Sequence, residues 1–173
     1  MSQVREAPAA EPFALANGDG ERLWFLDSEM TIKATAASTG GDLFFMETRL
    51  PAGFSPPLHV HHDEHEAFYV LEGELEIACG SERYRAVEGA FAFLPSGIAH
   101  TFRVTADARV LTIAVPGGFE GFFRGVGRPA EGPGMPPPAE FDIAAVRQVA
   151  ARFNTEFVGP PLGPSGSART ATA

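Results

Sequence analysis

The sequence predicts an all-β protein, an antiparallel sandwich or barrel, with short helices only towards the C-terminus. Between residues 22 and 115 the chain is a succession of short β-type runs separated by Gly, Pro, Asp and Ser. No stretch with helical periodicity interrupts these runs. This spacing is typical of antiparallel all-β folds and not of alternating strands and helices.

A single domain is expected, because 173 residues suffice for one sizeable core. Residues 1–12 are rich in Ala, Pro and Glu and are predicted to be a disordered leader. The barrel is expected over residues 13–125. Residues 126–162 are expected to form a loop and a C-terminal helix that pack on the barrel, and residues 163–173 a disordered tail.

The expected strands are short and alternate between two faces. They comprise residues 22–26, 30–36, 43–50, 67–71, 74–79, 83–86, 90–94, 99–104 and 108–115. In 43–50, alternation places Phe44, Met46, Thr48 and Leu50 on the inner face. Glu72-Gly73 predicts a hairpin between two of the strands. The run 67–71 is apolar on both faces, so its outer side is expected to pack on a second subunit.

The pattern changes after Val115. Residues 119–125 are expected to form a short helix, and the Gly/Pro-rich residues 125–140 an extended loop. That loop is a candidate lid, or equally an ordered wrap over the barrel or a dimer contact. Asp142 is expected to cap a helix that runs through Phe153.

Composition excludes several classes of protein. A net charge of −9 and a pI near 5.0 argue against nucleic-acid binding, which needs clustered Lys and Arg. Cys79 is the only cysteine, and its strand context predicts a packed, inert thiol. The sequence shows neither a signal-peptide core nor a run of the ~18 apolar residues that a membrane helix needs. We therefore expect a cytoplasmic protein that binds neither nucleic acid nor membrane.

The five histidines gather in two short phrases. These are Gly53-x5-His59-x-His61-x4-Glu66-x6-Gly73, which also holds His62 and His65, and Gly89-x5-Pro95-x-Gly97-x2-His100. His59 and His61 are two residues apart, so both imidazoles project from one face of an extended strand. Glu66 begins the next strand after a four-residue turn, where it can reach the same point. The turn at 95–97 directs His100 across the interior.

Three imidazoles and one carboxylate suit one divalent transition metal: iron, manganese, nickel, cobalt, copper or zinc. On an octahedral ion, such a set leaves two positions for a substrate oxygen and for O₂ or water. The pattern therefore predicts a metal site formed by His59, His61, Glu66 and His100. By strand parity His62 and His65 are expected in the turn at the barrel mouth, although His65 could replace or assist Glu66.

These two phrases match the two motifs of the cupin superfamily in register over residues 53–100. Flanking residues resemble the bacterial quercetin-dioxygenase-like cupins, namely Glu66-Ala-Phe-Tyr-Val-Leu-Glu-Gly73 and Pro116-Gly-Gly-Phe-Glu-Gly-Phe-Phe123. Val104 departs from the second motif, which often carries Asn there. The resemblance implies a double-stranded β-helix, a jelly-roll-like barrel, with the metal inside and a homodimeric assembly.

The resemblance also implies a reaction. A quercetinase-like dioxygenase would act with O₂ on an aromatic or enol substrate, with Glu66 as both ligand and base. One alternative is an isomerase or polyketide-type cyclase that uses the ion as a Lewis acid. Another is a metal-dependent small-molecule binder without catalysis. If the barrel holds a cavity, the expected substrate is flat, apolar and chelating.

Six apolar side chains are expected on the inner face near the ion and are the candidate pocket residues. They are Phe44, Met46, Phe68, Phe91, Phe93 and Phe102. For most of them the simpler interpretation is core packing, because small barrels are largely filled by their own side chains. No Arg or Lys falls on the predicted inner faces, which argues against sugar-phosphate substrates.

Overall fold

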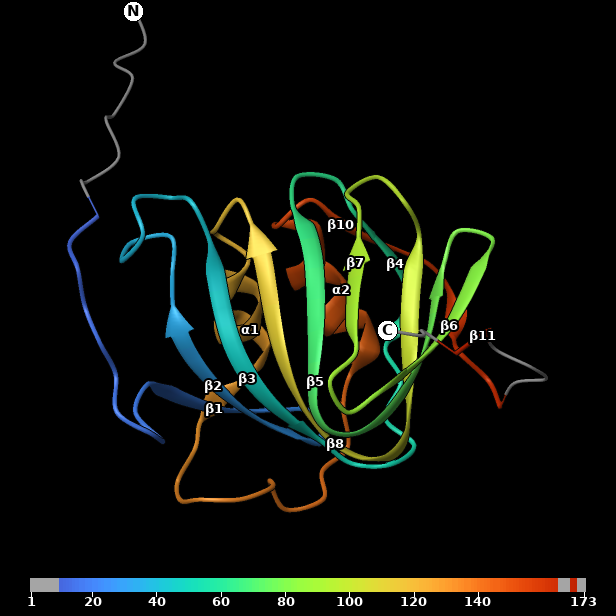
Figure 1. Ribbon diagram of the computed structural model, residues 1–173, viewed down its shortest axis with the longest axis horizontal. Coiled ribbons are helices and arrows are strands. Elements are labelled where there is room, and N and C mark those ends of the chain that lie inside the picture. The colour runs from blue at the N-terminus through green and yellow to red at the C-terminus, as the bar shows by residue number, and fades with distance from the viewer. Residues whose placement is uncertain (1–9, 165–168, 171–173) are drawn as a thin grey trace, which may run out of the picture.

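A computed structural model describes residues 10–164 and 169–170 (Figure 1). The predicted leader lies outside these residues except for 10–12, and the predicted tail except for 163–164 and 169–170. The described chain is mostly β, as predicted. One curved sheet has the strand order β11-β6-β5-β8-β3-β2-β1-β9, and β4, β7 and β10 pair beside this path. The helices α1 and α2 are both short.

The described chain contains the following elements. They are β1 (Glu21–Phe25), β2 (Ser28–Ala34), β3 (Phe44–Leu50), β4 (Pro57–His61), β5 (His65–Cys79), β6 (Glu82–Val87), β7 (Phe91–Leu94), β8 (His100–Val115), α1 (Glu120–Val126), β9 (Arg128–Pro129), α2 (Ile143–Ala151), β10 (Thr155–Pro161) and β11 (Arg169–Thr170). Among the described residues no helix has the length and apolar character needed to cross a bilayer.

The hairpin predicted at Glu72-Gly73 is wrong. β5 runs straight through it and pairs with β8 along nearly its whole length, with register shifts near Gly73. Gly73 has φ +82°, and a Cβ there would collide with the carbonyl oxygen of Asp107. The glycine therefore permits a bulge and a close strand approach, not a turn. The predicted strands 99–104 and 108–115 likewise merge into β8.

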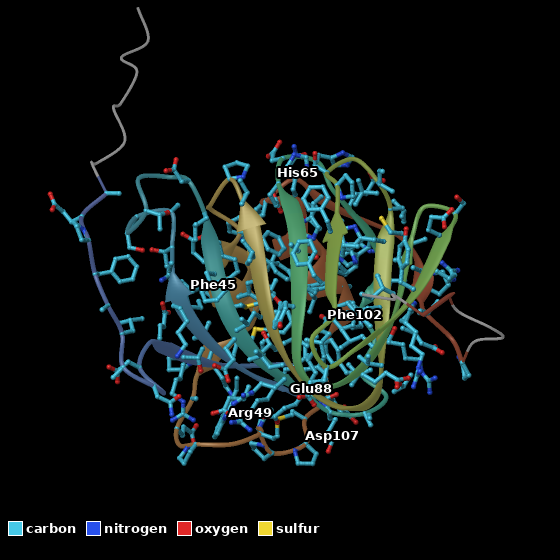
Figure 2. The ribbon with its side chains drawn as sticks, viewed as in Figure 1. Phe45, Arg49, His65, Glu88, Phe102 and Asp107 are labelled. Carbon is cyan, nitrogen blue, oxygen red and sulfur yellow. The ribbon has the colours of Figure 1, made fainter. Side chains whose placement is uncertain are left out.

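The inward face predicted for β3 is confirmed. Phe44, Met46, Thr48 and Leu50 are 0, 3, 2 and 5% exposed. Arg49 lies on the outer face of the same strand (Figure 2). Alternation predicts the inner face of β3 correctly because the core covers one face of this strand and not the other.

The helices pack against the buried side chains of β1, β2 and β3. Phe122 and Phe123 of α1 pack edge-on against Phe25, with ring centroids 5.5 and 5.1 Å apart. On α2, Val146 and Ala150 join the same hydrophobic cluster. The predicted cap of α2 is confirmed, because the Asp142 carboxylate accepts hydrogen bonds from the amides of Ala144 and Ala145 at 2.9 and 3.2 Å.

The loop between α1 and α2 is fastened to the β1–β2 hairpin. Arg22 donates to the carbonyl of Gly132 at 3.0 Å, and the Trp24 indole donates to the carbonyl of Gly134 at 2.8 Å. Glu29 accepts a hydrogen bond from the Gly134 amide at 3.1 Å. These bonds hold the loop against β1 and β2. This arrangement corresponds to the ordered wrap over the barrel, which the sequence offered as an alternative to a lid.

Strand β10 was not foreseen from the sequence. It carries a Gly-Pro-Pro segment, which is unfavourable in a sheet interior. It nevertheless pairs antiparallel with β4, placing Thr155 opposite His61 and Phe157 opposite His59. Register shifts on both sides of Gly159 accommodate the prolines. β10 thus supports β4, the strand that carries two of the predicted metal ligands, by pairing along its edge.

Candidate metal centre

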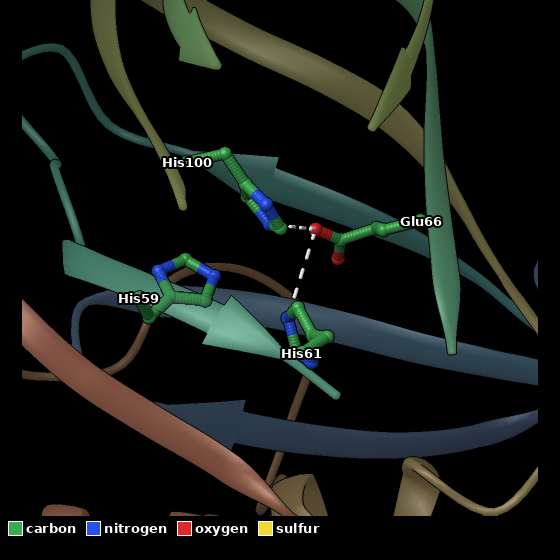
Figure 3. A group of neighbouring side chains, drawn as sticks. All are labelled: His59, His61, Glu66 and His100. Carbon is green, nitrogen blue, oxygen red and sulfur yellow. Dashed lines mark hydrogen bonds and ion pairs between the residues drawn. The ribbon is translucent and has the colours of Figure 1, made fainter. Parts of the chain in front are cut away.

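The structure brings His59, His61, Glu66 and His100 together inside the barrel (Figure 3). One potential ligand atom from each residue lies within 4.8 Å of every other. All four side chains are buried, with exposed fractions of 8, 2, 7 and 1% in sequence order. A buried group of this kind, drawn from three strands, can surround a single ion.

Strand register explains how residues 41 positions apart in the sequence meet. His59 on β4 stands directly opposite His100 at the start of β8. Glu66, near the start of β5, is paired with Leu94 of β7 on one side and Ala114 of β8 on the other. The His59 and His100 ring centroids are 4.5 Å apart. The Glu66 carboxylate lies 3.2 Å from His100 Nε2 and 4.0 Å from His61 Nε2.

Each of the three imidazoles has its Nδ1 occupied by an acceptor. His59 Nδ1 lies 2.7 Å from the carbonyl of Pro57, and His100 Nδ1 lies 3.0 Å from the carbonyl of Ile98. His61 Nδ1 lies 2.6 Å from the Glu64 carboxylate. These acceptors place a proton on Nδ1 in all three rings and turn each Nε2 toward the cluster, where Nε2 of His100 lies 3.2 Å from the Glu66 carboxylate.

Burial and the neighbouring charges shift the pKa values of the cluster residues. Burial, reinforced by the neighbouring His100 and His61, lowers the pKa of His59 to about 4, so this ring is neutral at neutral pH. Burial alone would raise the pKa of Glu66. The hydrogen bond from His100 and the three nearby imidazoles outweigh it and hold the pKa of Glu66 below its usual value. Burial alone would lower the pKa of His100, but the hydrogen bond to Glu66 and the charge of that carboxylate raise it overall. Metal binds neutral imidazole and ionised carboxylate, so an ion bound here would displace the proton that His100 shares with Glu66.

A cavity of about 290 Å³ opens next to the cluster. His59, His61 and Glu66 form part of its wall, and most of the remaining lining is aromatic or aliphatic. Three predicted pocket residues, Met46, Phe68 and Phe102, lie on it. So do six Phe residues that sequence reasoning missed: Phe25, Phe54, Phe119, Phe122, Phe123 and Phe157.

Comparison with known proteins agrees with this geometry. Residues 46–116 match the protein family described as Cupin domain. This chain belongs to the cupin superfamily. It is 34% identical over 151 residues to quercetin 2,3-dioxygenase from Bacillus subtilis, covering 85% of this chain and 44% of that protein.

Two further comparisons extend the match. Quercetin 2,3-dioxygenase from Aspergillus japonicus is 27% identical over 132 residues, covering 69% of this chain and 37% of that protein. The cupin chain thus spans less than half the length of both dioxygenases. Oxalate decarboxylase from Bacillus subtilis superposes with a TM-score of 0.51 at 18% identity, over 62% of this chain and 31% of that one, which shows a shared fold.

The donor set of this cupin fits a divalent transition metal. Metal–nitrogen and metal–oxygen bonds are about 2.0–2.2 Å long for such ions. Ligand atoms no more than 4.8 Å from each other need only small side-chain shifts to share one ion at those lengths. Mixed imidazole and carboxylate donors accept several first-row metals, so the donor set does not select one of them.

Glu64 is a neighbour of the cluster that the sequence did not reveal. It is 6% exposed, and its carboxylate is the acceptor for His61 Nδ1. The Thr155 hydroxyl lies 3.1 Å from the same nitrogen. A carboxylate behind a ligating histidine fixes the ring and raises its basicity. The turn 63–66 contains three acidic residues, and only packing shows that Glu64 turns inward beside Glu66.

His62 and His65 lie outside the cluster. The His62 side chain is 43% exposed and lies 3.5 Å from Glu156. His65 is exposed at the rim of the barrel, where its Nδ1 accepts a hydrogen bond from the Ser96 amide (Figure 2). Neither imidazole belongs to the group of atoms that could share one ion.

The predicted inward positions of Phe91 and Phe93 are wrong. These side chains are 58 and 53% exposed, on the outer face of β7. The inward positions belong to Ala92 and Leu94. This short strand is apolar on both faces, so alternation alone does not show which face is inward. The prediction placed the larger side chains inside, whereas the structure places the smaller ones there. Phe44 is fully buried in the core and does not line the cavity, in line with the simpler interpretation.

Proposed function

We propose that this cupin is a mononuclear metal-dependent dioxygenase that acts with O₂ on a flat, chelating aromatic or enol such as a flavonol. His59, His61, Glu66 and His100 would hold the ion. The observation that carries the proposal is the apolar cavity that shares three of these side chains with the cluster. The similarity to two quercetin 2,3-dioxygenases supports the same reaction class.

The lining of the cavity restricts the substrate. Among the described residues that line it, Glu66 is the only acidic side chain, and none is Arg or Lys. Besides the ion itself, the described lining of the cavity therefore offers no cationic side chain to offset the charge of a dicarboxylate or a sugar phosphate. The volume lies at the lower end of the range for drug-sized ligands. A compact, uncharged aromatic compound therefore fits better than an oxalate-like or phosphorylated one.

Glu66 is the proposed base. Its carboxylate is ionised and is shielded from bulk solvent, and it forms part of the cavity wall. A carboxylate oxygen can therefore accept the proton of an enol bound in the cavity. His100, hydrogen-bonded to the other side of the same carboxylate, orients it. The apolar walls exclude water from the deprotonated substrate. A redox-capable ion, when bound, supplies the route by which electrons pass from the substrate to O₂.

Oxygen uptake tests this proposal. Protein loaded with iron, manganese, nickel, cobalt or copper should consume about one O₂ per flavonol, and labelled O₂ should deliver both atoms to the products. His59→Ala protein treated with the same metal is the control, since it corrects for flavonol oxidation by free ion.

Three results would overturn or redirect the proposal. Product formed equally well without O₂ would indicate the isomerase or cyclase that uses the ion as a Lewis acid. Binding of the flavonol without any product would indicate a metal-dependent binder. Uptake at the same rate in the His59→Ala control would show that the cluster takes no part.

We also propose that the chain forms a homodimer through the outer face of β5 and β7. Tyr69 and Phe91 pair across these strands and are 40 and 58% exposed. Phe93, also exposed, pairs with Ala67. Exposed aromatic side chains gathered on one sheet face are typical of association surfaces. A two-fold axis would allow the same face of a second copy to cover them.

A further inference from the structure

Two threonines interrupt the apolar wall of the cavity. Thr48 on β3 is 2% exposed, and its hydroxyl oxygen is buried with no hydrogen-bond partner. Thr112 on β8 is 4% exposed, and Thr48 is the one of the two whose hydroxyl is fully buried without a partner among the described residues. Both residues line the cavity.

Other hydroxyls on the same wall are satisfied. Ser55 donates to the carbonyl of Phe102 at 2.7 Å and accepts a hydrogen bond from the Leu162 amide at 3.0 Å. Thr155 is engaged with His61 and with the carbonyl of Phe153. A buried polar group without a partner is destabilising, so valine would suit position 48 better if this side chain served packing alone.

Strand register places the two threonines in line with the metal cluster. Glu66 pairs with Ala114 of β8, and Thr112 occupies the next inward position of that strand, opposite Phe68. Thr48 lies one inward position further, opposite Val110. Inward positions on a strand are two residues, or roughly 6.6–6.8 Å, apart. Thr48 is therefore about 13 Å from the Glu66 row along the barrel.

We propose that Thr48, with Thr112 between it and the cluster, is a polar subsite for the remote end of the substrate. This inference rests on the proposed function and deepens it. The substrate would chelate the ion at one end and carry a hydroxyl or carbonyl group on a distant ring. A 120° rotation about χ1 moves the hydroxyl of a threonine into the position that its methyl group held, so Thr48 can turn its hydroxyl toward such a group.

The test compares two flavonols that share one chelating group. Quercetin carries hydroxyls on its outer rings, whereas 3-hydroxyflavone has none beyond the chelating one. Affinities would be measured without O₂, so that no turnover occurs, on metal-loaded wild type and Thr48→Val protein. Ser28→Ala is the matched control, since Ser28 also has an unpartnered buried hydroxyl but does not line the cavity.

We expect wild-type protein to bind quercetin more tightly than 3-hydroxyflavone. Thr48→Val should weaken quercetin binding by roughly 5–10-fold, the effect of one net hydrogen bond, and leave 3-hydroxyflavone unchanged. Ser28→Ala should change neither affinity. Melting of the metal-free proteins provides a second readout. Neither variant should melt below wild type, because each loses a hydroxyl that has no partner.

Three outcomes would overturn the subsite. If both flavonols bind and Thr48→Val changes neither affinity, the subsite is absent while the proposed function stands. Equal weakening of both flavonols would show a general change of cavity shape. Failure of wild type to bind either flavonol would overturn the subsite together with the proposed substrate class.

Discussion

At the scale of single residues, the metal cluster depends on which nitrogen of each histidine is free. The carbonyls of Pro57 and Ile98 accept from Nδ1 of two of the rings, whereas His61 is the one cluster histidine whose Nδ1 faces a carboxylate. Local backbone geometry therefore orients His59 and His100. His61 depends on Glu64, which a separate turn supplies.

Removal of one cluster imidazole should abolish stoichiometric metal. We expect His59→Ala to lose most of its bound ion, because three of the four donors then remain and the ring that faces His100 is gone. His62→Ala should keep one equivalent, since His62 points to Glu156 at the surface. Elemental analysis of protein purified without chelator measures both.

The same analysis separates Glu66 from its neighbour in the sequence. Glu66→Ala should lose metal and His65→Ala should retain it. Metal kept by the Glu66 variant and lost by the His65 variant would assign the fourth donor to His65 and contradict the proposed ligand set.

Glu64 should affect the metal without touching it. We expect Glu64→Ala to weaken metal binding by about 10–100-fold, because His61 loses the acceptor that fixes its ring. Glu64→Gln, which retains an acceptor oxygen, should lose less. Competition with a chromogenic chelator gives the affinity.

Glu156→Gln is the control for a lost surface carboxylate near the same strand. An unchanged affinity in Glu64→Ala, with the fold intact by circular dichroism, would show that Thr155 alone suffices to orient His61.

At the scale of elements, two long bent strands build the barrel. β5 and β8 each replace what the sequence presented as two strands, and the glycine that resembled a hairpin turn lies in a bulge. A positive φ favours glycine in both settings, so sequence could not distinguish them. The difference lies in the neighbouring Asp107 backbone, which belongs to a strand 34 residues further along the chain.

Gly73→Ala should destabilise the fold much more than Gly89→Ala. The two glycines have nearly equal φ angles of +82 and +81°, so each alanine incurs about 1–2 kcal/mol of left-handed backbone strain. Only at Gly73 would the new Cβ also meet backbone atoms of Asp107 and Ala108; at Gly89 the space is open. Urea denaturation should show this as two clearly separated midpoints. Equal midpoints would mean that β5 and β8 can move apart at the bulge.

At the scale of the whole molecule, one face of the sheet carries exposed aromatic side chains while the opposite face encloses the site. We expect Phe93→Lys to shift a dimer toward monomer in sedimentation velocity, because a charge would enter the centre of the apolar interface. Phe13→Lys is the matched control, since Phe13 is 52% exposed but lies outside the sheet. Equal sedimentation of both variants and wild type would contradict the proposed interface.

The sequence by itself determined the all-β class, the four cluster residues as a group and the capped C-terminal helix. These rest on local rules: strand parity placed His59 and His61 on one face, and Asp142 satisfies the amides directly after it. Tertiary structure decided which face of β7 is inward, that β10 supports β4, that Glu64 reaches His61, and that Thr48 lies unpartnered in a cavity. Each of these depends on a partner distant in the chain, whose position only the packing of the whole barrel sets.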